Sequence, residues 1–340
     1  MIRAFSGKTA DDVWRQAISS FKNYSDCTIQ QSRLGVMQEI LHANFYIENP
    51  RERWVVSRVP AINPAFAIAE VFWILAGSND SAFINFWNPS LPKYAGNSDT
   101  YHGAYGYRII NQFGINQLER AFYALKNNPD SRQVVIQLWD ASNDFPDESG
   151  KPVSADIPCN LFSMPKVRNG KLEWTQVMRS NDLYRGTPYN IVQFTTLQEI
   201  MAGWLGLEIG GYYQVSDSLH VYESDAQELK CQQPQVSCRN NDILSIDKDR
   251  YDALFGRLWS YLCELSALNL TINRFNKLIN DVNIPKAYEN LLLIAAADSA
   301  RRRGWYDEME LAIEKCTNPL LVSLINAWIV RWSKMQKIIN

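Results

Sequence analysis

A cysteine directly after a proline is the first candidate for chemistry in this sequence. Cys159 lies in the segment SADIPCNLFSMPKV, which runs from Ser154 to Val167, and it begins an apolar run. A cysteine at such a place is either a small core residue or a thiolate held toward a ligand. A thiolate is both a good nucleophile and a workable leaving group. The polar residues farther along the chain help to decide between a core residue and a thiolate held toward a ligand.

Two later segments place polar residues inside otherwise apolar stretches. The first has the sequence RSNDLYRGTPYN and runs from Arg179 to Asn190, and the second, SLHVY, ends at Tyr222. Arg179 and Ser180 end an expected strand, and Asn190 lies in the first turns of an apolar helix. Buried polar groups need hydrogen-bond partners, and a bound small molecule is one way to supply them.

A carboxylate in an apolar helix is the next candidate. Glu70 occurs in AIAEVFWIL, where every other residue is apolar. Burying an unpaired carboxylate is costly, so we expect Glu70 to have either a structural partner or a catalytic role.

The order of these blocks resembles the family of thymidylate synthases and pyrimidine-nucleotide hydroxymethylases. Its pattern is Pro-Cys, then Arg-Ser-x-Asp with Gly-x-Pro-aromatic-Asn, then His-x-Tyr, and all three blocks occur here in order. The resemblance runs from about Arg33 to Asp225, more than half of the chain. It implies an α/β (α+β) fold with a large mixed sheet covered by helices. We expect a catalytic domain over residues 1–245 and a helical C-terminal extension over residues 246–340.

The resemblance implies a covalent mechanism. Cys159 would attack C6 of a pyrimidine ring, which makes C5 a carbon nucleophile, and a nearby arginine is expected to lower the pKa of the thiol. Glu70 would organise proton transfer near the base and help to activate water. Tyr105, in HGAYGYR, corresponds to a tyrosine near the catalytic cysteine.

Nucleotide binding is implied for a second set of residues. The phosphate would be held by Arg33, Arg132, Arg179 and Ser180, and the sugar hydroxyl would be contacted by His220 and Tyr222. Guanidinium groups suit phosphate oxygens because they offer paired donors. Arg132 corresponds to an arginine that the family donates from the second subunit, so a homodimer is implied.

The base is expected to be uracil. Asn190 offers an amide donor and acceptor side by side, which complements O4 and N3–H of uracil. Cytosine-specific members of the family carry aspartate at this position. Asn160, beside the nucleophile, is a second candidate for contact with the substituent at C4.

The implied co-substrate is 5,10-methylenetetrahydrofolate, and no metal is expected. Its binding residues would be Trp87, Asp182, Gly186 and Tyr189. Asp182 corresponds to the residue that contacts the pterin, and we also count it among the catalytic residues.

The sequence departs from the thymidylate synthase pattern at several positions, of which Arg185 belongs to the expected folate pocket. Asn160 replaces a histidine, Met178 a glutamine, Gln133 a second partner-donated arginine, and Arg185 an apolar residue. A second tryptophan and the short tail that closes over folate have no counterpart. Since a looser lid admits water, we favour hydroxymethylation of dUMP or UMP.

Three alternatives remain open. They are reductive methylation of dUMP, hydroxymethylation of dCMP or CMP, and nucleotide binding without catalysis. Cys159, Glu70 and Asn190 argue against the last, because binding alone requires no nucleophile. Release of tritium from a C5-labelled nucleotide would separate an enzyme from a binding protein.

Several elements must position these residues. Asn63 and Gly77 bound an expected buried helix, a strand is expected at about 133–139, and Asn169-Gly170 is a strong hairpin signal. A long apolar helix begins near Pro188 and is followed by a strand through YYQVSDSLHVY. From about residue 250 onward, helical periodicity is found without strand alternation.

Composition narrows the class of protein. A net charge of −2 over 340 residues gives no reason to expect nucleic-acid or membrane binding. We expect neither a signal peptide nor a membrane helix. The six cysteines include no CxxC pair, which argues against structural zinc and a disulfide framework, so the cytoplasm is the expected location.

Overall fold

The computed structural model describes residues 3–22, 27–225, 239–280 and 283–339. Its centre is a seven-stranded mixed sheet in the order β1-β3-β7-β6-β5-β4, with β2 paired to β3. The strands are β1 (Arg3–Gly7), β2 (Thr28–Ser32), β3 (Gly35–Ile47), β4 (Ile136–Gln137), β5 (Asn160–Arg168), β6 (Lys171–Asp182) and β7 (Glu208–Tyr222). The expected mixed α/β fold is therefore confirmed.

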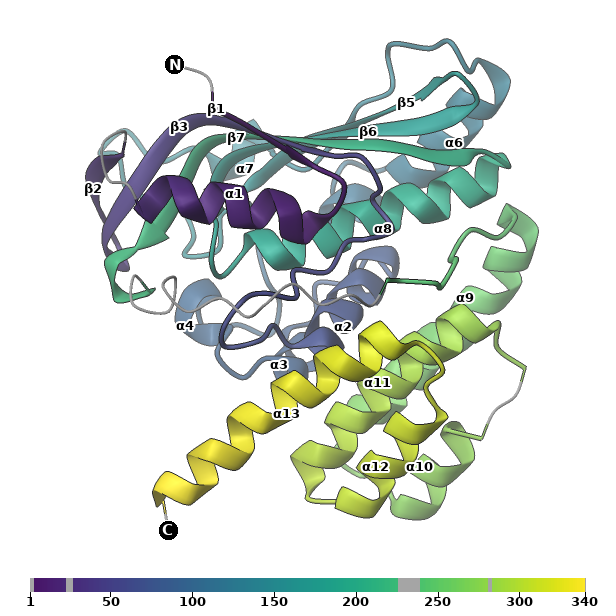
Figure 1. The fold of residues 1–340 in the computed structure, drawn as a ribbon. Helices are drawn as coiled ribbons and strands as arrows, with labels where there is room; N and C mark the ends of the chain where they lie inside the picture. Colours follow the sequence, from purple (N-terminus) through teal and green to yellow (C-terminus); the bar gives the residue numbers. More distant parts are fainter. Residues whose placement is uncertain (1–2, 23–26, 226–238, 281–282, 340) are drawn as a thin grey trace.

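Helices cover the sheet and form a separate layer below it (Figure 1). Those of the first part are α1 (Ala10–Lys22), α2 (Pro64–Leu75), α3 (Ser81–Trp87), α4 (Pro92–Ala95), α5 (Tyr105–Tyr107), η1 (Arg108–Gln112), α6 (Gln117–Asn127), α7 (Ala141–Asp144), α8 (Thr187–Leu205) and η2 (Glu223–Asp225). Those of the second part are α9 (Lys248–Ser266), α10 (Ile272–Leu278), α11 (Lys286–Arg303), α12 (Tyr306–Lys315) and α13 (Pro319–Ile339).

The register of β6 and β7 brings distant polar residues together. These strands are parallel, and Ser180 lies opposite Ser218 while Asp182 lies opposite His220. The hairpin between β5 and β6 is confirmed, and its two turn residues Asn169 and Gly170 have φ angles of 51° and 72°. Positive φ at both positions is typical of the tight turn that an Asn-Gly pair favours.

The strand expected at about 133–139 is much shorter in the structure. β4 pairs with β5 only at Ile136 and Gln137. The next two amides, of Leu138 and Trp139, both donate to the carbonyl of Leu161 at 2.8 and 3.0 Å, so the regular ladder ends there. Alternation of apolar residues could not reveal this irregularity in the pairing.

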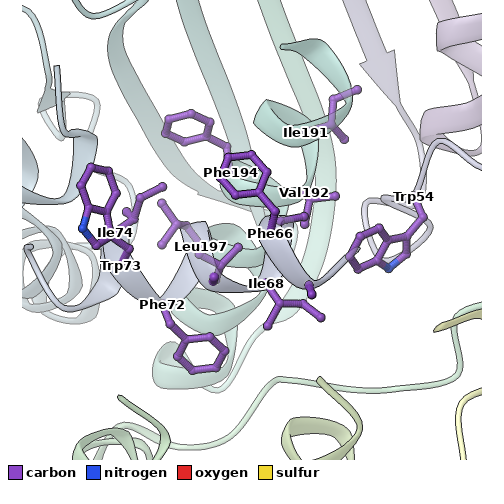
Figure 2. Close-up of a cluster of buried hydrophobic side chains, with 14 of the residues drawn as sticks. Trp54, Phe66, Ile68, Phe72, Trp73, Ile74, Ile191, Val192, Phe194 and Leu197 are labelled. Atoms are coloured by element: carbon purple, nitrogen blue, oxygen red, sulfur yellow. The ribbon is translucent and has the colours of Figure 1, made fainter. Parts of the chain in front are cut away.

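Helix α2 lies between two layers, which explains its uniformly apolar sequence. The side chain of Asn63 caps it by accepting from the Phe66 amide at 3.2 Å, as the sequence predicts. One side of α2 packs against α8, and the shared core is shown in Figure 2. The other side packs against α11 of the C-terminal helices. A helix buried on both sides needs apolar residues all round, and within α2 only Glu70 is not fully buried.

The C-terminal helices join the rest of the protein through a polar cluster. Asn290 and Asn318 both donate to the carboxylate of Asp242, at 3.0 and 2.7 Å. Glu199 of α8 accepts from the amide of Leu244 at 3.1 Å. The long helical stretch expected near the C-terminus is interrupted at residues 316–318, where Asn318 caps α13. The division into domains at 245/246 stays a prediction.

Candidate functional site

Residues from distant parts of the chain, from Arg33 to Arg331, line one large cavity of about 1230 Å³. The sequence-predicted residues in its wall are Arg33, Glu70, Trp87, Tyr105, Cys159, Arg179, Ser180, Asp182, Gly186, Tyr189, Asn190, His220 and Tyr222. Asn160 and Arg132 are not part of this wall. Cavities for one small ligand hold roughly 300–1,000 Å³, so this one has room for two.

Cys159 is placed at the cavity wall directly before β5. Burial raises the pKa of its thiol, while Arg179 acts in the opposite direction and Asp156 and Asp182 add to the rise. The expected lowering of the thiol pKa by a nearby arginine is present, but burial exceeds it, so the pKa is raised overall in the ligand-free protein. Desolvation of the charged form outweighs the attraction of a single guanidinium.

Arg179 also shapes the loop that carries the cysteine. Its Nε donates to the carbonyl of Pro158 and its Nη2 to that of Ile157, both at 3.0 Å. The guanidinium lies 5.7 Å from the ring centre of Trp139. These two hydrogen bonds hold the carbonyl groups of the two residues directly before the cysteine. Arg179 therefore positions the cysteine and also lines the cavity.

Glu70 faces the same cavity from α2. Its Oε2 is buried and has no hydrogen-bond partner among the described residues. Burial raises the pKa of this carboxyl to about 8, against a smaller lowering by Gln193. The carboxyl is thus protonated at neutral pH and can donate a proton or hold a water molecule.

Asn160 lies beneath the cysteine in a buried amide network. Its Oδ1 accepts from Gln176 at 2.8 Å, and Gln176 in turn accepts from the hydroxyl of Ser163 at 2.6 Å. The Nδ2 atom of Asn160 has no hydrogen-bond partner in the described chain. It lies near Tyr105, whose pKa is raised by burial and, less strongly, by Cys159, while Asn160 acts to lower it.

Tyr105 is held in place by its neighbours in HGAYGYR. Arg108 forms a double hydrogen bond with the buried Asp144, at 2.6 and 2.8 Å, and His102 contacts the same carboxylate at 2.8 Å. A Cβ on Gly106 would lie only 2.4 Å from the carbonyl oxygen of Ile74, so only glycine allows this close approach to α2.

The other two predicted phosphate arginines differ in position. Arg33, in the turn between β2 and β3, donates from Nη2 to the carbonyl of Tyr94 at 2.8 Å and lines the cavity. Arg132 is exposed in the segment before β4 and lies outside the cavity wall of its own chain.

The predicted base and sugar contacts come together at the start of α8 and the end of β7. Asn190 is buried in the first turns of α8, and Gly186 is the N-cap of that helix. His220 is also buried, its Nδ1 has no hydrogen-bond partner in the described chain, and burial lowers its pKa. Tyr222 packs edge-on against His220 with ring centres 5.4 Å apart. Unpaired polar atoms at a cavity are typical of a ligand-binding wall.

Asp182 has a structural role in addition to lining the cavity. Its Oδ1 accepts from the amides of Tyr184 and Arg185, at 2.9 and 2.7 Å. Burial raises the pKa of this carboxyl. Its carboxylate therefore fixes the turn that leads from β6 into α8.

The predicted folate residues Trp87 and Tyr189 form another part of the wall. Asn63 links them: its amide donates to the hydroxyl of Tyr189 at 2.9 Å, and its side chain donates to the carbonyl of Trp87 at 3.3 Å. Trp87 is fully buried, and its Nε1 has no hydrogen-bond partner in the described chain. This part of the wall therefore combines aromatic rings with a donor that has no partner among the described residues.

Arg185 occupies a position where the family has an apolar residue, and its guanidinium group is bound by an acidic side chain. It forms a double hydrogen bond with Asp225, at 2.7 and 3.1 Å, and it lies 5.0 Å from the ring centre of Tyr222. It therefore stiffens the cavity wall near His220 and Tyr222.

Sequence reasoning missed several residues of the wall. Asp156 accepts from the Gly103 amide at 2.7 Å, and burial raises its pKa. Its proximity to Cys159, three residues away, was a signal in SADIPCN. The C-terminal helices add Arg301, Arg302, Trp328 and Arg331, and no motif indicated that they would reach the site.

The described residues include neither a metal-binding cluster nor a membrane-spanning helix. No group of three or more His, Cys, Asp or Glu side chains is placed to hold a metal ion. No helix in the described ranges is both long enough and apolar enough to cross a membrane.

Fold and site together define an α/β protein with a cysteine in an arginine-rich cavity. A family model described as thymidylate synthase matches residues 55–257, more than half of the chain. The chain belongs to the thymidylate synthase family.

Individual relatives carry two different names. A protein of Bacillus phage SP01 named deoxyuridylate hydroxymethyltransferase is 34% identical over 232 residues, which cover 65% of this chain and 59% of the relative. One of the same name from Pseudomonas phage M6 is 38% identical over 176 residues, 51% of this chain and 49% of the relative. Thymidylate synthase 1 of Bacillus subtilis is 32% identical over 174 residues, 49% of this chain and 60% of the relative. The matched part thus spans about half to three-fifths of these relatives.

Proposed function

We propose that this protein transfers a one-carbon unit to C5 of dUMP and releases hydroxymethyl-dUMP. The observation that carries the proposal is the convergence of Cys159, Glu70, Asn190 and Arg179 on one cavity with room for two ligands. The relatives named deoxyuridylate hydroxymethyltransferase support both the base and the branch. The proposed co-substrate, 5,10-methylenetetrahydrofolate, would supply the one-carbon unit, and no metal is involved.

The residues can perform the first step as follows. The thiol of Cys159 loses its proton and adds to C6, so the S–C6 bond forms while the C5–C6 double bond opens toward O4. Arg179 is close enough to stabilise the thiolate, and an amide hydrogen bond from Asn190 to O4 would stabilise the enolate. The bond from C5 to the transferred carbon would form as that carbon leaves a nitrogen of the co-substrate, and the proton on C5 would pass to solvent. After water has added to the transferred carbon, the Cys159 sulfur would leave C6 and the C5–C6 double bond would return.

Water must take part in the last step of hydroxymethylation. Glu70 Oε2 is buried, has no hydrogen-bond partner among the described residues and belongs to a residue of the same cavity wall as Cys159, so it could hold a water molecule beside C5. The protonated Glu70 is suited to exchange a proton with that water because its pKa of about 8 lies close to neutral pH.

The direct test is to identify the product. The protein is incubated with methylenetetrahydrofolate and dUMP, UMP, dCMP or CMP, and products are analysed by mass, with tritium release from each nucleotide labelled at C5 measured in parallel. We expect tritium release and a hydroxymethyl product from dUMP. Formation of thymidylate would establish reductive methylation instead, and absence of tritium release with all four nucleotides would contradict an enzyme.

Base choice has a separate test at Asn190. Asn190→Asp should shift the preference from dUMP toward dCMP, because a carboxyl group can stabilise a protonated N3 of cytosine whereas an amide cannot. A mismatched buried pair costs about 1–3 kcal/mol, roughly tenfold to a hundredfold in kcat/KM. A wild type that prefers a cytosine nucleotide would overturn the assignment of Asn190.

We further propose a homodimer in which Arg132 of one subunit completes the phosphate site of the other. Arg132 is exposed and distant from its own cavity wall, and β3 and β7 leave Leu41 and Tyr213 exposed on the sheet. A cytoplasmic location is supported by the described cysteines (Cys27, Cys159, Cys263 and Cys316), which are all unpaired thiols.

A further inference from the structure

Helices α11 and α13 form one end of the cavity, although they lie beyond residues 55–257, the segment that matches the family. Arg301 and Arg302 come from the end of α11, and Trp328 and Arg331 come from α13. In Figure 1, α11 and α13 lie next to α2 on the side away from the sheet. These four side chains therefore close the cavity from the side opposite the sheet.

A buried carboxylate organises three of these side chains. Asp298, which is fully buried, accepts from Nε of Arg301 and from Nε of Arg302, each at 2.8 Å, and from Nε1 of Trp328 at 3.3 Å. The guanidinium of Arg331 lies 5.2 Å from the ring centre of Trp328. Asp298 thus gathers Arg301, Arg302 and Trp328, and with Arg331 three guanidinium groups meet at this end of the cavity wall.

The cluster lies at the folate end of the cavity, away from the expected phosphate site. Arg302 donates from Nη2 to the carbonyl of Trp87 at 2.5 Å. Arg331 is within electrostatic reach of Tyr189, whose pKa is raised by burial and lowered in part by Arg58 and Arg331. Trp87 and Tyr189 are the residues that we assign to the co-substrate.

We propose that Arg301 and Arg331 of the C-terminal helices bind the glutamate carboxylates of the folate co-substrate. This inference rests on the proposed function, because it deepens the assignment of the second ligand. A folate carries two carboxylates at the end remote from its pterin ring, and guanidinium groups are the side chains best suited to carboxylates. The helical extension would then replace the missing tail as a wall of the folate site.

The test compares two ligands that differ only in the glutamate. Folic acid and pteroic acid, which lacks the glutamate, are titrated into protein saturated with dUMP, and tryptophan fluorescence reports binding. We expect wild type to bind folic acid at least about tenfold more tightly than pteroic acid. Arg301→Gln and Arg331→Gln should each lose most of this difference, with unchanged affinity for pteroic acid and for dUMP.

Arg303→Gln is the matched control. Arg303 belongs to the same helix end but does not line the cavity, and it donates to the carbonyls of Ser299 and Ala267. It should keep the tenfold preference, and thermal melts of all three variants report on folding. Unchanged folic acid affinity in both Arg301→Gln and Arg331→Gln, or an equal loss in Arg303→Gln, would overturn the inference alone. A wild type that binds neither dUMP nor folic acid would overturn the proposed function with it.

Discussion

Cys159 shows how a residue's surroundings set its chemistry. Its thiol is kept neutral in the ligand-free protein because burial outweighs the nearby guanidinium of Arg179. A bound nucleotide would bring its own groups next to the sulfur, so the thiolate need exist only while it attacks. This arrangement protects a reactive cysteine from oxidation when no substrate is present.

Cys159→Ser should abolish turnover and leave nucleotide binding intact. A hydroxyl is a far weaker nucleophile than a thiolate, so we expect kcat to fall at least about a hundredfold. Turnover is measured by tritium release from C5 and dUMP affinity by calorimetry. Cys263→Ser, which changes a partly buried cysteine of α9 outside the cavity wall, is the control. More than about a tenth of wild-type turnover in Cys159→Ser would contradict the covalent role.

Glu70 should make the stability of the protein depend on pH. Its pKa is about 8 in the folded chain and near the ordinary glutamate value in the unfolded chain. Between these two values the unfolded chain binds fewer protons than the folded chain, so the free energy of unfolding falls as pH rises toward about 8 and then levels off.

Glu70→Gln removes this titration. The free energy of unfolding of Glu70→Gln minus that of wild type should become more positive from pH 5 to pH 8, by an amount on the order of 1–3 kcal/mol. Urea unfolding at several pH values measures the difference. Glu48→Gln, at an exposed position of the chain, should show no such trend. A constant difference between Glu70→Gln and wild type would argue against a protonated Glu70.

At the scale of elements, the close packing of α5 on α2 positions Tyr105 beside the cysteine. Gly106→Ala would bring a Cβ to 2.4 Å from the Ile74 carbonyl oxygen and 2.5 Å from the Ile74 Cα. Since backbone must move, we expect a loss of about 1–3 kcal/mol in the free energy of unfolding and a lower kcat. Gly256→Ala in α9 meets no atom within 4 Å, so it should be neutral or stabilising. Urea unfolding of both variants is the measurement, and equal stabilities would show that α5 is free to shift.

Local signals predicted some elements well and others poorly. The Asn63 cap, the Asn169-Gly170 hairpin and the long helix near Pro188 are each fixed by residues close in sequence, and the structure contains all three. The short β4 depends on how β5 pairs with it, which no local pattern records. The arginines of α11 and α13 reach the cavity only because α11 packs on α2. That contact joins segments more than 200 residues apart in the chain.

At the scale of the whole molecule, one chain does not bring to its own cavity every residue that the phosphate site is expected to use. Arg132 is exposed and lies outside the cavity wall of its own chain. If a partner donates it, the dimer is a condition of activity. In a two-fold symmetric dimer each subunit completes the other's site, so each of the two sites would contain one Arg132 from the partner subunit.

Arg132→Ala should weaken dUMP binding by about tenfold, as expected for loss of a charge-assisted hydrogen bond to phosphate. Sedimentation velocity should show a dimer for this variant and for wild type. Arg120→Ala, at an exposed arginine of α6 outside the cavity wall, should bind dUMP as wild type does. Unchanged dUMP affinity in Arg132→Ala, or a monomeric wild type, would remove the basis for the shared site.

Mixing the inactive Cys159→Ser with Arg132→Ala, which should keep about a tenth of wild-type activity at subsaturating dUMP, tests the donation itself. A heterodimer of Cys159→Ser and Arg132→Ala contains one site with an intact cysteine and an intact arginine from the partner, while its other site lacks both. Random reassociation makes half of the dimers mixed, so roughly a quarter of wild-type activity should return, because one site in two is restored in half of the molecules. Activity is assayed by tritium release from C5 of dUMP at a subsaturating concentration. If each site instead used the arginine of its own chain, no mixed dimer would contain an intact site and mixing would restore nothing.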